Sequence, residues 1–483
     1  MITMENKQRV KTIAVIFIIA IVLISLITEF LYIFNNKYTY SKLQPEKGVL
    51  TLSQEEIDSN SFHFLIKDWE FYEDALLTPT YFKNQTSLPN MKYVSIGDTE
   101  SAYTSQTKNN TFIGTYRMKI NFPEKEGFYA LEMPQVYSAY ELYINDKLYL
   151  KVGDTHNYKA QIQNRCTFFA ASGETYITIA VKDASGIKAG ITSPPTLGKP
   201  YSINITRAFK FLINNFIMTL IFFGALFSLI LAISGKSNYS YMFFFMCLIY
   251  AVYLNHPLIN LCFSMGGNFS YVFEYFCTHF VYLMVIMLQN RLCNLNKNVS
   301  SISEICGSVF CAIAFVYGVF TPYLSAPLCT FLSTLCNVFE WLAAIYLVAI
   351  GTYAVFNDIK YGRIFLFGNV CFAVSLLLYI IQPLYDSIYT DQSVEIGILT
   401  ILGCLYFVYW ASIIDNYRRN IVLDDERRLM ERQINLYKEN YVHITEQIEE
   451  TRKLRHDMRQ HFRVISDFAN NRQFDKIAEY LEE

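Results

Sequence analysis

The sequence has few charged residues. Only 17% of its 483 residues are Asp, Glu, Lys or Arg, against about 25% in soluble globular proteins, and the net charge is −2. No global positive field therefore favours nucleic acid as a partner. Long apolar runs accompany this lack of charge. They cover residues 13–34 and much of 209–414, and runs of this length are typical of membrane-spanning helices.

Cysteine is nearly absent from the polar region between these apolar blocks. Of eleven cysteines, ten lie between Cys247 and Cys404, and only Cys166 falls in the polar region. A single cysteine cannot form an intramolecular disulfide, so an outer domain has to be held by core packing. The sequence also lacks CxxC pairs and the phosphate-binding or dinucleotide-binding fingerprints. We therefore expect this chain to bind no metal and no cofactor.

The apolar runs predict eight spans. The first follows the basic segment "MENKQRVK", and its length and the lack of a small-residue cleavage site favour a retained anchor over a cleaved signal peptide. The expected spans are residues 13–34, 209–234, 239–263, 269–291, 303–321, 328–356, 363–386 and 395–414.

Basic residues alternate between the connecting loops. The loops "FSMGGN", "TPYLSAP" and "YDSIYTDQSVE" carry no Lys or Arg. The other loops carry Lys236, Arg291, Lys297, Lys360, Arg363, Arg418 and Arg419. By the positive-inside rule, this pattern predicts a multi-pass membrane protein with both termini cytoplasmic and residues 35–205 outside.

Residues 111–182 predict an all-β outer domain. Short segments rich in Tyr, Ile, Val and Thr alternate in polarity, and "YELYINDKLYLKV" predicts a hairpin that turns at Asn145-Asp146. The order of these segments resembles the jelly-roll, galactose-binding-like modules of glycosidases and bacterial receptor ectodomains. The resemblance implies a small extracellular ligand such as a carbohydrate. Its binding residues are unknown, since Tyr137, Tyr140 and Tyr158 could stack on a sugar or belong to the core.

Two ionisable side chains fall at similar depth in different spans. His279 lies in the fourth span and Glu340 in the sixth. A carboxylate–imidazole pair would lower the cost of holding either group in hydrocarbon. We consider two roles for such a pair, a conformational latch between helices and a hydrogen bond that only fixes their packing.

From Asp415 to the end the sequence contains no Pro or Gly. Apolar residues recur here at spacings of three and four over about five heptads, which predicts a coiled coil or helical bundle. A lone helix would leave this stripe in water, so we expect a homodimer through residues 415–483. Asn470 and Asn471 predict a left-handed stop, after which "FDKIAEYLEE" starts a second helix. The expected stripe is Met430, Ile434, Tyr437, Tyr441, Ile444, Ile448, Thr451, Arg455, Met458, Phe462 and Ile465.

The stretch "ETRKLRHDMRQHFRVI" contains two histidines. The helical phase places His456 at an exposed shoulder of the stripe, whereas His461 is next to Phe462 and is expected to be partly packed. Asp457 can accept a proton from one imidazole nitrogen and leave the other as a nucleophile. Arginines create a local positive field that suits a phosphate or an acidic partner, at Arg452, Arg455 and Arg459.

Simpler explanations of this stretch compete with phosphate chemistry. Lipid binding is disfavoured, because His456 lies roughly 60 Å from the last span along a continuous helix. A metal site is disfavoured, because the two histidines are five residues apart and do not align on a helix. A solvated face of a coiled coil remains the main alternative.

"LRHDMRQHFRVI" resembles the phospho-acceptor box of bacterial sensor histidine kinases. The similar branch carries an ATPase domain of the gyrase/Hsp90/kinase/MutL superfamily. The resemblance implies that His456 accepts the γ-phosphoryl group of ATP and passes it to a response-regulator receiver domain, and that Asp457 orients or deprotonates the imidazole. It implies ATP and Mg²⁺ for the complete kinase. Since no ATP-binding box occurs in the 483 residues, we expect the chain to end before that ATPase domain.

The overall layout resembles bacterial seven-transmembrane receptors with diverse intracellular signalling modules, and this resemblance implies a bacterial cell membrane as the location. Whether the chain acts as an enzyme stays open, because a non-catalytic receptor whose helical hairpin serves docking or phosphotransfer is the alternative. A transporter is disfavoured by the outer domain and the stalk, and by the lack of paired broken helices. The expected parts are an N-terminal tip and first span (1–34), a β-sandwich sensor domain (35–205), a seven-helix membrane domain (206–414), a signalling and phospho-acceptor helix (415–469) and the start of a second dimerisation helix (470–483).

Overall fold

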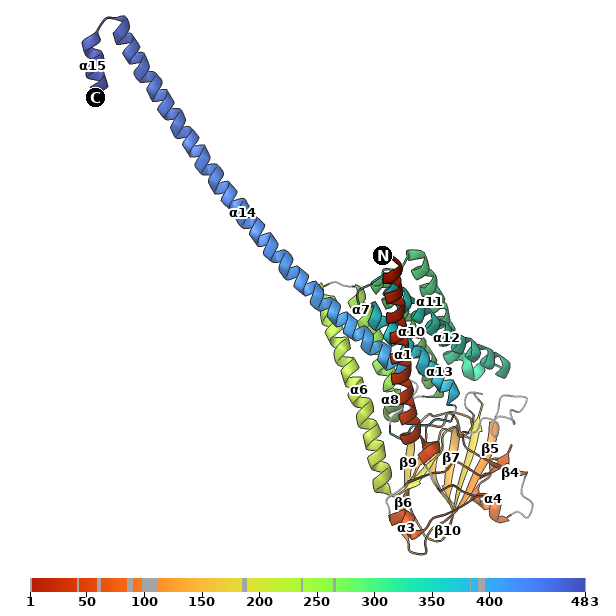
Figure 1. Cartoon of the computed structure of the whole chain (residues 1–483). Coiled ribbons are helices and arrows are strands. Elements are labelled where there is room, and N and C mark those ends of the chain that lie inside the picture. Colours follow the sequence, from red (N-terminus) through yellow and green to blue (C-terminus); the bar gives the residue numbers. More distant parts are fainter. Residues whose placement is uncertain are drawn as a thin grey trace. The chain divides into compact units, whose positions relative to one another are not determined.

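The computed structural model combines a β-sandwich with long apolar helices and a helical stalk (Figure 1). It divides into two units, Met1–Tyr406 and Phe407–Glu483, which are described separately below. The structure describes residues 2–40, 43–58, 62–84, 90–97, 112–184, 189–235, 238–263, 266–382, 384–389 and 396–482.

The larger sheet of the sandwich has seven strands and is antiparallel apart from β1, which pairs in parallel with β5. Its strands are rich in β-branched and aromatic residues, which favour a pleated, half-buried surface. The order is β4 (Met91–Val94), β3 (Trp69–Glu73), β5 (Phe112–Asn121), β10 (Glu174–Asp183), β7 (Ala139–Ile144) and β8 (Lys147–Val152), with β1 (Val49–Thr51) beside β5.

The smaller sheet has four antiparallel strands and packs its apolar face against the larger one. The core between the sheets includes Trp69 and Tyr140 from the larger sheet and Tyr129 and Phe169 from the smaller one, all buried. Two packed sheets around one core form a β-sandwich. The order is β2 (Phe62–Phe64), β11 (Thr196–Gly198), β6 (Gly127–Met133) and β9 (Arg165–Ala171).

The structure confirms the predicted fold class, and it adds detail to the outer domain. The expected strands correspond to β5, β6, β7, β8 and β10, and the β7–β8 hairpin turns at Asn145, whose φ is 50°. The remaining strands were not predicted. Three short helices lie outside the segment 111–182 from which the strands were predicted, α2 (Lys37–Tyr40), α3 (Gln54–Asp58) and α4 (Pro79–Asn84).

Seven helices in the described residues are long and apolar enough to cross a membrane, and α7 is a shorter apolar helix. They are consistent with a multi-pass membrane protein. The seven lie in α1 (Ile2–Phe34), α6 (Pro200–Gly235), the continuous stretch of α9 (Gly267–Val272), the π-helical turn η1 (Phe273–Cys277) and α10 (Thr278–Leu292), α11 (Lys297–Phe320), α12 (Ala326–Phe356), α13 (Gly362–Ile381) and α14 (Ile396–Asn470). The shorter elements among them are α7 (Asn238–Leu254), α8 (His256–Phe263) and a 3₁₀ turn η2 (Thr321–Tyr323).

Two expected spans are not single regular helices. The span at 239–263 is interrupted at Asn255, between α7 and α8, where Pro257 follows and favours a helix start. The span at 269–291 contains the π-helical turn η1 between α9 and α10. Lys236 and residues 390–395 of an expected outer loop lie outside the described residues.

The N-terminal helix α1 is packed into the bundle. Ala20 and Ile24 of α1 are buried against Leu366 and Val370 of α13. A small residue such as alanine lets two helix backbones approach closely within a membrane. The helix is therefore a structural member of the bundle as well as an anchor.

Candidate functional site

The candidate phospho-acceptor site lies on α14, in the unit Phe407–Glu483 (Figure 1). From Asp415 to its end this helix contains no Gly or Pro to interrupt it. Ion pairs at i,i+4 spacing join Arg428 with Asp424 (3.0 Å) and Arg427 with Glu431 (3.2 Å) along its exposed surface. Helix propensity and ion pairs on the surface thus stabilise the helix that carries the two histidines.

His456 and Asp457 form the centre of the site. Their side chains are 76% and 67% exposed, and His456 Nδ1 lies 3.5 Å from Asp457 Oδ1. That distance is at the long limit of a hydrogen bond. The geometry assigns Nδ1 to the carboxylate, and it leaves Nε2 as the nitrogen that faces solvent and can act as a nucleophile.

The basic neighbours of His456 are also exposed. Arg452, Arg455 and Arg459 form no ion pair or hydrogen bond within residues 396–482 as the structure describes them. Guanidinium groups without a carboxylate partner can bind phosphate oxygens with paired N–H donors. The surface around His456 therefore has the charge that a phosphate or an acidic partner requires.

His461 differs from the expectation that it would be partly packed. It is exposed, but its Nδ1 lies 2.7 Å from the hydroxyl of Tyr480, and Tyr480 belongs to the second helix α15 (Phe474–Glu482). Phe468 also contacts the Tyr480 ring, with centroids 6.2 Å apart. His461 thus joins the two limbs of the helical hairpin, whereas His456 contacts the adjacent Asp457 on its own helix.

The hairpin turn forms where it was predicted, but a different residue takes the left-handed conformation. That residue is Arg472, with φ 56°, and not Asn470 or Asn471. The N–H of Gln473 donates to the carbonyl of Phe468 (3.0 Å), and the N–H of Arg472 donates to the carbonyl of Ala469 (3.1 Å). This pair of bonds is a Schellman motif, which requires the left-handed residue one position after the helix cap.

The expected pair of His279 and Glu340 does not form. His279 is buried, and its ring nitrogens lie 2.7 Å from the carbonyl oxygen of Tyr275 and 3.4 Å from that of Cys336. Its ring stacks on Phe339, with centroids 5.6 Å apart. Within the described residues no hydrogen bond or ion pair joins His279 to Glu340. The ring can therefore donate from Nδ1–H to the carbonyl oxygen of Tyr275, which is the nearer of the two. The contacts of this histidine are made without Glu340.

None of the three tyrosines considered for sugar stacking is free on an open face of the sandwich. Tyr140 is fully buried in the core. Tyr137 stacks on Tyr271 of α9, with centroids 6.0 Å apart. The hydroxyl of Tyr158 lies 3.4 Å from Asp183 Oδ2.

The sandwich is joined to the apolar helices at a first junction next to α1. Asn35 Oδ1 accepts hydrogen bonds from the backbone N–H groups of Ile388 (3.2 Å) and Tyr389 (2.7 Å). Lys37 forms an ion pair with Asp386 at 2.8 Å. This junction connects the start of the sandwich domain to the loop between α13 and α14. The polar residues that follow the first span are visible in the sequence, but their partners some 350 positions away are not.

A second junction joins loops of the sandwich to α8 and α9. The Gln163 amide donates to the carbonyl of Asn260 (2.9 Å), and the Asn260 amide donates to Ser270 (2.6 Å). The hydroxyl of Tyr271 donates to the carbonyl of Tyr137 (3.2 Å). Gln163, Asn260 and Ser270 are buried. A movement of the sandwich would therefore act directly on the ends of these helices.

In the described part of the chain, no group of three or more His, Cys, Asp or Glu side chains is placed to hold a metal ion. His456 lies on an exposed helix face, which cannot enclose a nucleotide. A phosphoryl donor would therefore have to be presented to His456 by another domain.

Comparisons with known proteins identify only distant structural likeness. No family model matches the chain, and no curated protein matches it significantly. Among solved structures, a GH2 β-galacturonidase from Eisenbergiella tayi bound to galacturonate is 11% identical (TM-score 0.21) and covers 29% of this chain and 24% of that chain. A Faecalibacterium prausnitzii β-glucuronidase is 14% identical (TM-score 0.22), and the match covers 29% of this chain and 31% of that chain. An uncultured Clostridium sp. β-glucuronidase is 16% identical (TM-score 0.21), and the match covers 29% of this chain and 29% of that chain. This chain thus spans less than a third of each of these proteins, and no ligand or activity follows from the likeness.

Proposed function

We propose that the chain is the sensor and phospho-acceptor part of a bacterial membrane histidine kinase in a two-component system. His456 would accept the γ-phosphoryl group of ATP and pass it to an aspartate of a response-regulator receiver domain. One observation carries the proposal. An exposed His456 lies beside Asp457, among exposed arginines, within the sequence "LRHDMRQH".

The chemistry of the proposed step uses the two nitrogens of His456 differently. Nε2 attacks the γ-phosphorus in line, the bond from that phosphorus to the bridging oxygen breaks, and ADP leaves with the electron pair. As positive charge develops on the ring, Nδ1–H donates to Asp457, which lies 3.5 Å away. Arg452 and Arg459, four residues before and three residues after His456 on the same helix face, stabilise the charge on the phosphoryl oxygens. ATP and Mg²⁺ are substrates of this step, held by the ATPase domain of a kinase.

Dimerisation through residues 415–483 is part of the proposal. The apolar stripe of the stalk is exposed in the single chain, and Tyr437 and Tyr441 are each about three-quarters exposed. A stripe of this length at 3–4 spacing matches a second copy of the same helix. In a dimer, His456 of one chain would become accessible to an ATPase domain bound to either chain.

We further propose that both termini are cytoplasmic and that residues 35–205 bind a small extracellular ligand such as a carbohydrate. The two junctions support a coupling of this domain to the helices, because they connect the sandwich to the loop before α14 and to α8 and α9. A ligand that binds two states of the sandwich with different affinity would shift the helix ends to which it is bonded. The same helix α14 that contains the last span also carries His456.

A phosphotransfer assay with supplied components tests the proposal. The full chain in detergent or nanodiscs is mixed with a purified ATPase domain of this kinase class and Mg²⁺-ATP labelled at the γ-position. We expect an acid-labile, alkali-stable label on the chain that is lost in His456→Gln and retained in His461→Gln. Asp457→Asn should slow labelling by about a hundredfold, because it removes the charge that stabilises the ring.

The control variants separate the competing functions. Equal loss of label in His456→Gln and His461→Gln would contradict the choice of acceptor. A wild-type chain that takes no label but still binds the receiver domain would support the alternative function, a non-catalytic docking receptor. Transfer from labelled chain to a receiver domain would complete the proposed sequence of steps.

A further inference from the structure

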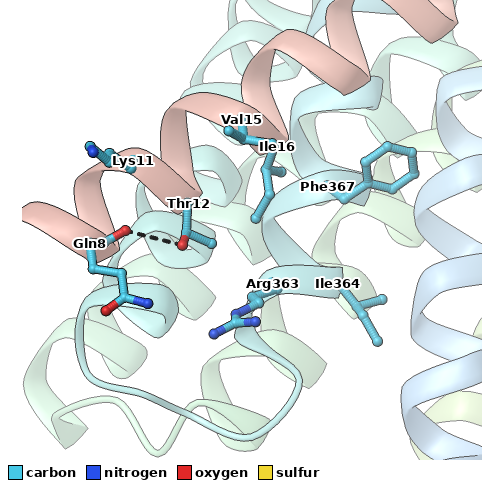
Figure 2. Close-up of a pocket in the computed structure, with 8 residues that line it drawn as sticks. All are labelled: Gln8, Lys11, Thr12, Val15, Ile16, Arg363, Ile364 and Phe367. Carbon is cyan, nitrogen blue, oxygen red and sulfur yellow. Dashed lines mark hydrogen bonds between the residues drawn. The ribbon is translucent and has the colours of Figure 1, made fainter. Parts of the chain in front are cut away.

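A pocket of about 410 Å³ lies between the beginnings of α1 and α13, at the ends of these helices away from the sandwich. Figure 2 shows Arg363 extending from the start of α13 into the space beside Gln8 and Thr12 of α1. The hydroxyl of Thr12 donates to the carbonyl of Gln8 at 3.1 Å. Polar and cationic groups thus gather at one end of the pocket.

The other end of the pocket is apolar. Val15, Ile16 and Phe367 line it, each about one helical turn further along its helix than the cations. Residue 13 begins the apolar run of α1, so the pocket lies at the boundary between water and hydrocarbon. A molecule that fills it has to carry charge at one end and hydrocarbon at the other.

The two cations of this pocket, Lys11 and Arg363, are exposed, and within the described residues neither forms an ion pair or a hydrogen bond. Arg9, two residues before Lys11, donates to the carboxylate of Asp358 and to the carbonyl of Phe356. Asp358 is therefore already engaged, and the pocket is lined by one cation from each helix, Lys11 of α1 and Arg363 of α13.

We propose that this pocket binds an anionic phospholipid, with its phosphate between Lys11 and Arg363 and an acyl chain along Val15, Ile16 and Phe367. Basic pockets between membrane helices recognise anionic headgroups, and arginine matches the oxygens of a phosphate with paired donors. The lipid would bridge α1 and α13 and would reinforce the contact of Ala20 and Ile24 with α13. This site is independent of the phosphotransfer chemistry at His456.

Lipid titration of the full chain in a neutral detergent tests the site. The probes are phosphatidylglycerol, phosphatidylcholine and inorganic phosphate, and the readouts are the thermal unfolding midpoint and retained lipid in native mass spectrometry. We expect phosphatidylglycerol alone to raise the midpoint and to be retained. The double variant Lys11→Gln/Arg363→Gln should bind it about thirtyfold more weakly, the loss expected for two basic residues at a membrane surface.

Two further variants distinguish a built site from general attraction of anionic lipid. Arg291→Gln/Lys297→Gln removes the same charge at the turn between α10 and α11 and should bind phosphatidylglycerol as the wild type does. Lys11→Arg/Arg363→Lys keeps both charges and should retain most of the binding. The proposal is overturned if phosphatidylcholine or inorganic phosphate stabilises the chain equally, or if the control variant loses as much binding as the pocket variant.

Discussion

The sandwich buries large apolar side chains in its core, whereas the stalk leaves its own exposed to solvent. In the sandwich, Trp69 and Tyr140 are fully buried between two sheets of the same chain. In the stalk, Tyr437 and Tyr441 are 75% and 74% exposed, although they belong to a regular apolar stripe. One region completes its core within a single chain, and the other leaves its apolar stripe exposed.

This difference has an energetic consequence. Complete burial of a large apolar side chain contributes about 1.5–3 kcal/mol, and the sandwich gains this contribution as it folds. The stalk gains it only on association with another helix, and a lone helix depends on propensity and surface ion pairs. The folded sandwich is therefore a property of one chain, whereas burial of the stalk stripe would come only with the proposed dimer.

The largest effect should come from a charge placed on the stripe of the stalk. Ile444→Glu removes an apolar side chain from both helices of the proposed dimer and leaves two unpaired carboxylates in the interface. Together these changes should cost about 6 kcal/mol or more per dimer, which dissociates a dimer of micromolar affinity. Förster transfer between labelled full chains in nanodiscs measures the association.

Leu436→Glu is the matched control for Ile444→Glu. Leu436 is 59% exposed, but it lies on the face of the helix turned away from Ile434 and Tyr437. Transfer should stay at the wild-type level in this variant. If both variants dissociate the chains, or neither does, the interface does not follow the predicted stripe.

The next largest effect should come from the sandwich core, and it should not depend on association. Phe71 is 1% exposed and contacts Tyr116, with ring centroids 4.8 Å apart. Phe71→Ala should lower the free energy of unfolding of the outer domain by about 3–5 kcal/mol, from lost burial and the cavity that remains. Thermal unfolding followed by protease susceptibility measures the change.

Phe128→Ala provides the comparison within the same domain. Phe128 is 60% exposed and stacks on Phe168, with centroids 6.4 Å apart. Its removal should change stability by no more than about 0.5 kcal/mol. Equal losses in the two phenylalanine variants would mean that the sandwich does not hold its core as the structure describes.

Periodicity explains which parts of the sandwich could be predicted. The strands β5, β7, β8 and β10 have several alternating residues, and this alternation is enough to indicate a strand from the sequence alone. β2 and β11 are three residues long and buried throughout, so they show no alternation that could identify them. Their pairing is set by contacts far apart in the sequence, as in the match of Thr196 with Phe64.

The same limit applies to the candidate site. Helical phase predicted the exposure of His456, because that property depends on one helix only. Counting residues inward from the ends of the spans placed His279 at the same depth in the membrane as Glu340. The count could not give the rotation of α12 about its axis, and in the structure α12 turns Cys336 and Phe339 towards His279 instead. The contact of His461 with Tyr480 depends on the hairpin turn, and no local pattern shows it.

A buried acid offers a further test of the self-contained sandwich. Glu141 is only 11% exposed and accepts hydrogen bonds from Tyr143 (2.7 Å) and Thr155 (3.2 Å) and an ion pair from Lys151 (3.0 Å). Burial by itself raises the pKa of Glu141, but the bonds from Tyr143 and Lys151 outweigh burial and hold this pKa below its usual value.

The sign of the resulting pH dependence follows from that shift. A carboxyl whose pKa is lower in the folded state stabilises the fold above its unfolded pKa, and this stability is lost as the pH falls through the folded pKa. Glu141→Gln should therefore cost about 1–3 kcal/mol at neutral pH and reduce the loss of stability on acidification. The exposed Glu126→Gln should alter neither. Acid titration of outer-domain unfolding measures both, and an unchanged acid profile in Glu141→Gln would contradict the proposed role.

The smallest effect should occur in the stalk hairpin, where one hydrogen bond joins the two limbs. Tyr480→Phe keeps the ring that contacts Phe468 but removes the hydroxyl that lies 2.7 Å from His461 Nδ1. An exposed hydrogen bond contributes about 0.5–1.5 kcal/mol, so amide exchange in α15 should become up to about tenfold faster. Tyr437→Phe removes a hydroxyl elsewhere on the stalk and should leave exchange in α15 unchanged. If Tyr480→Phe also leaves exchange unchanged, the bond between His461 and Tyr480 does not hold helix α15 in place, and the proposed dimer contacts become the explanation to test next.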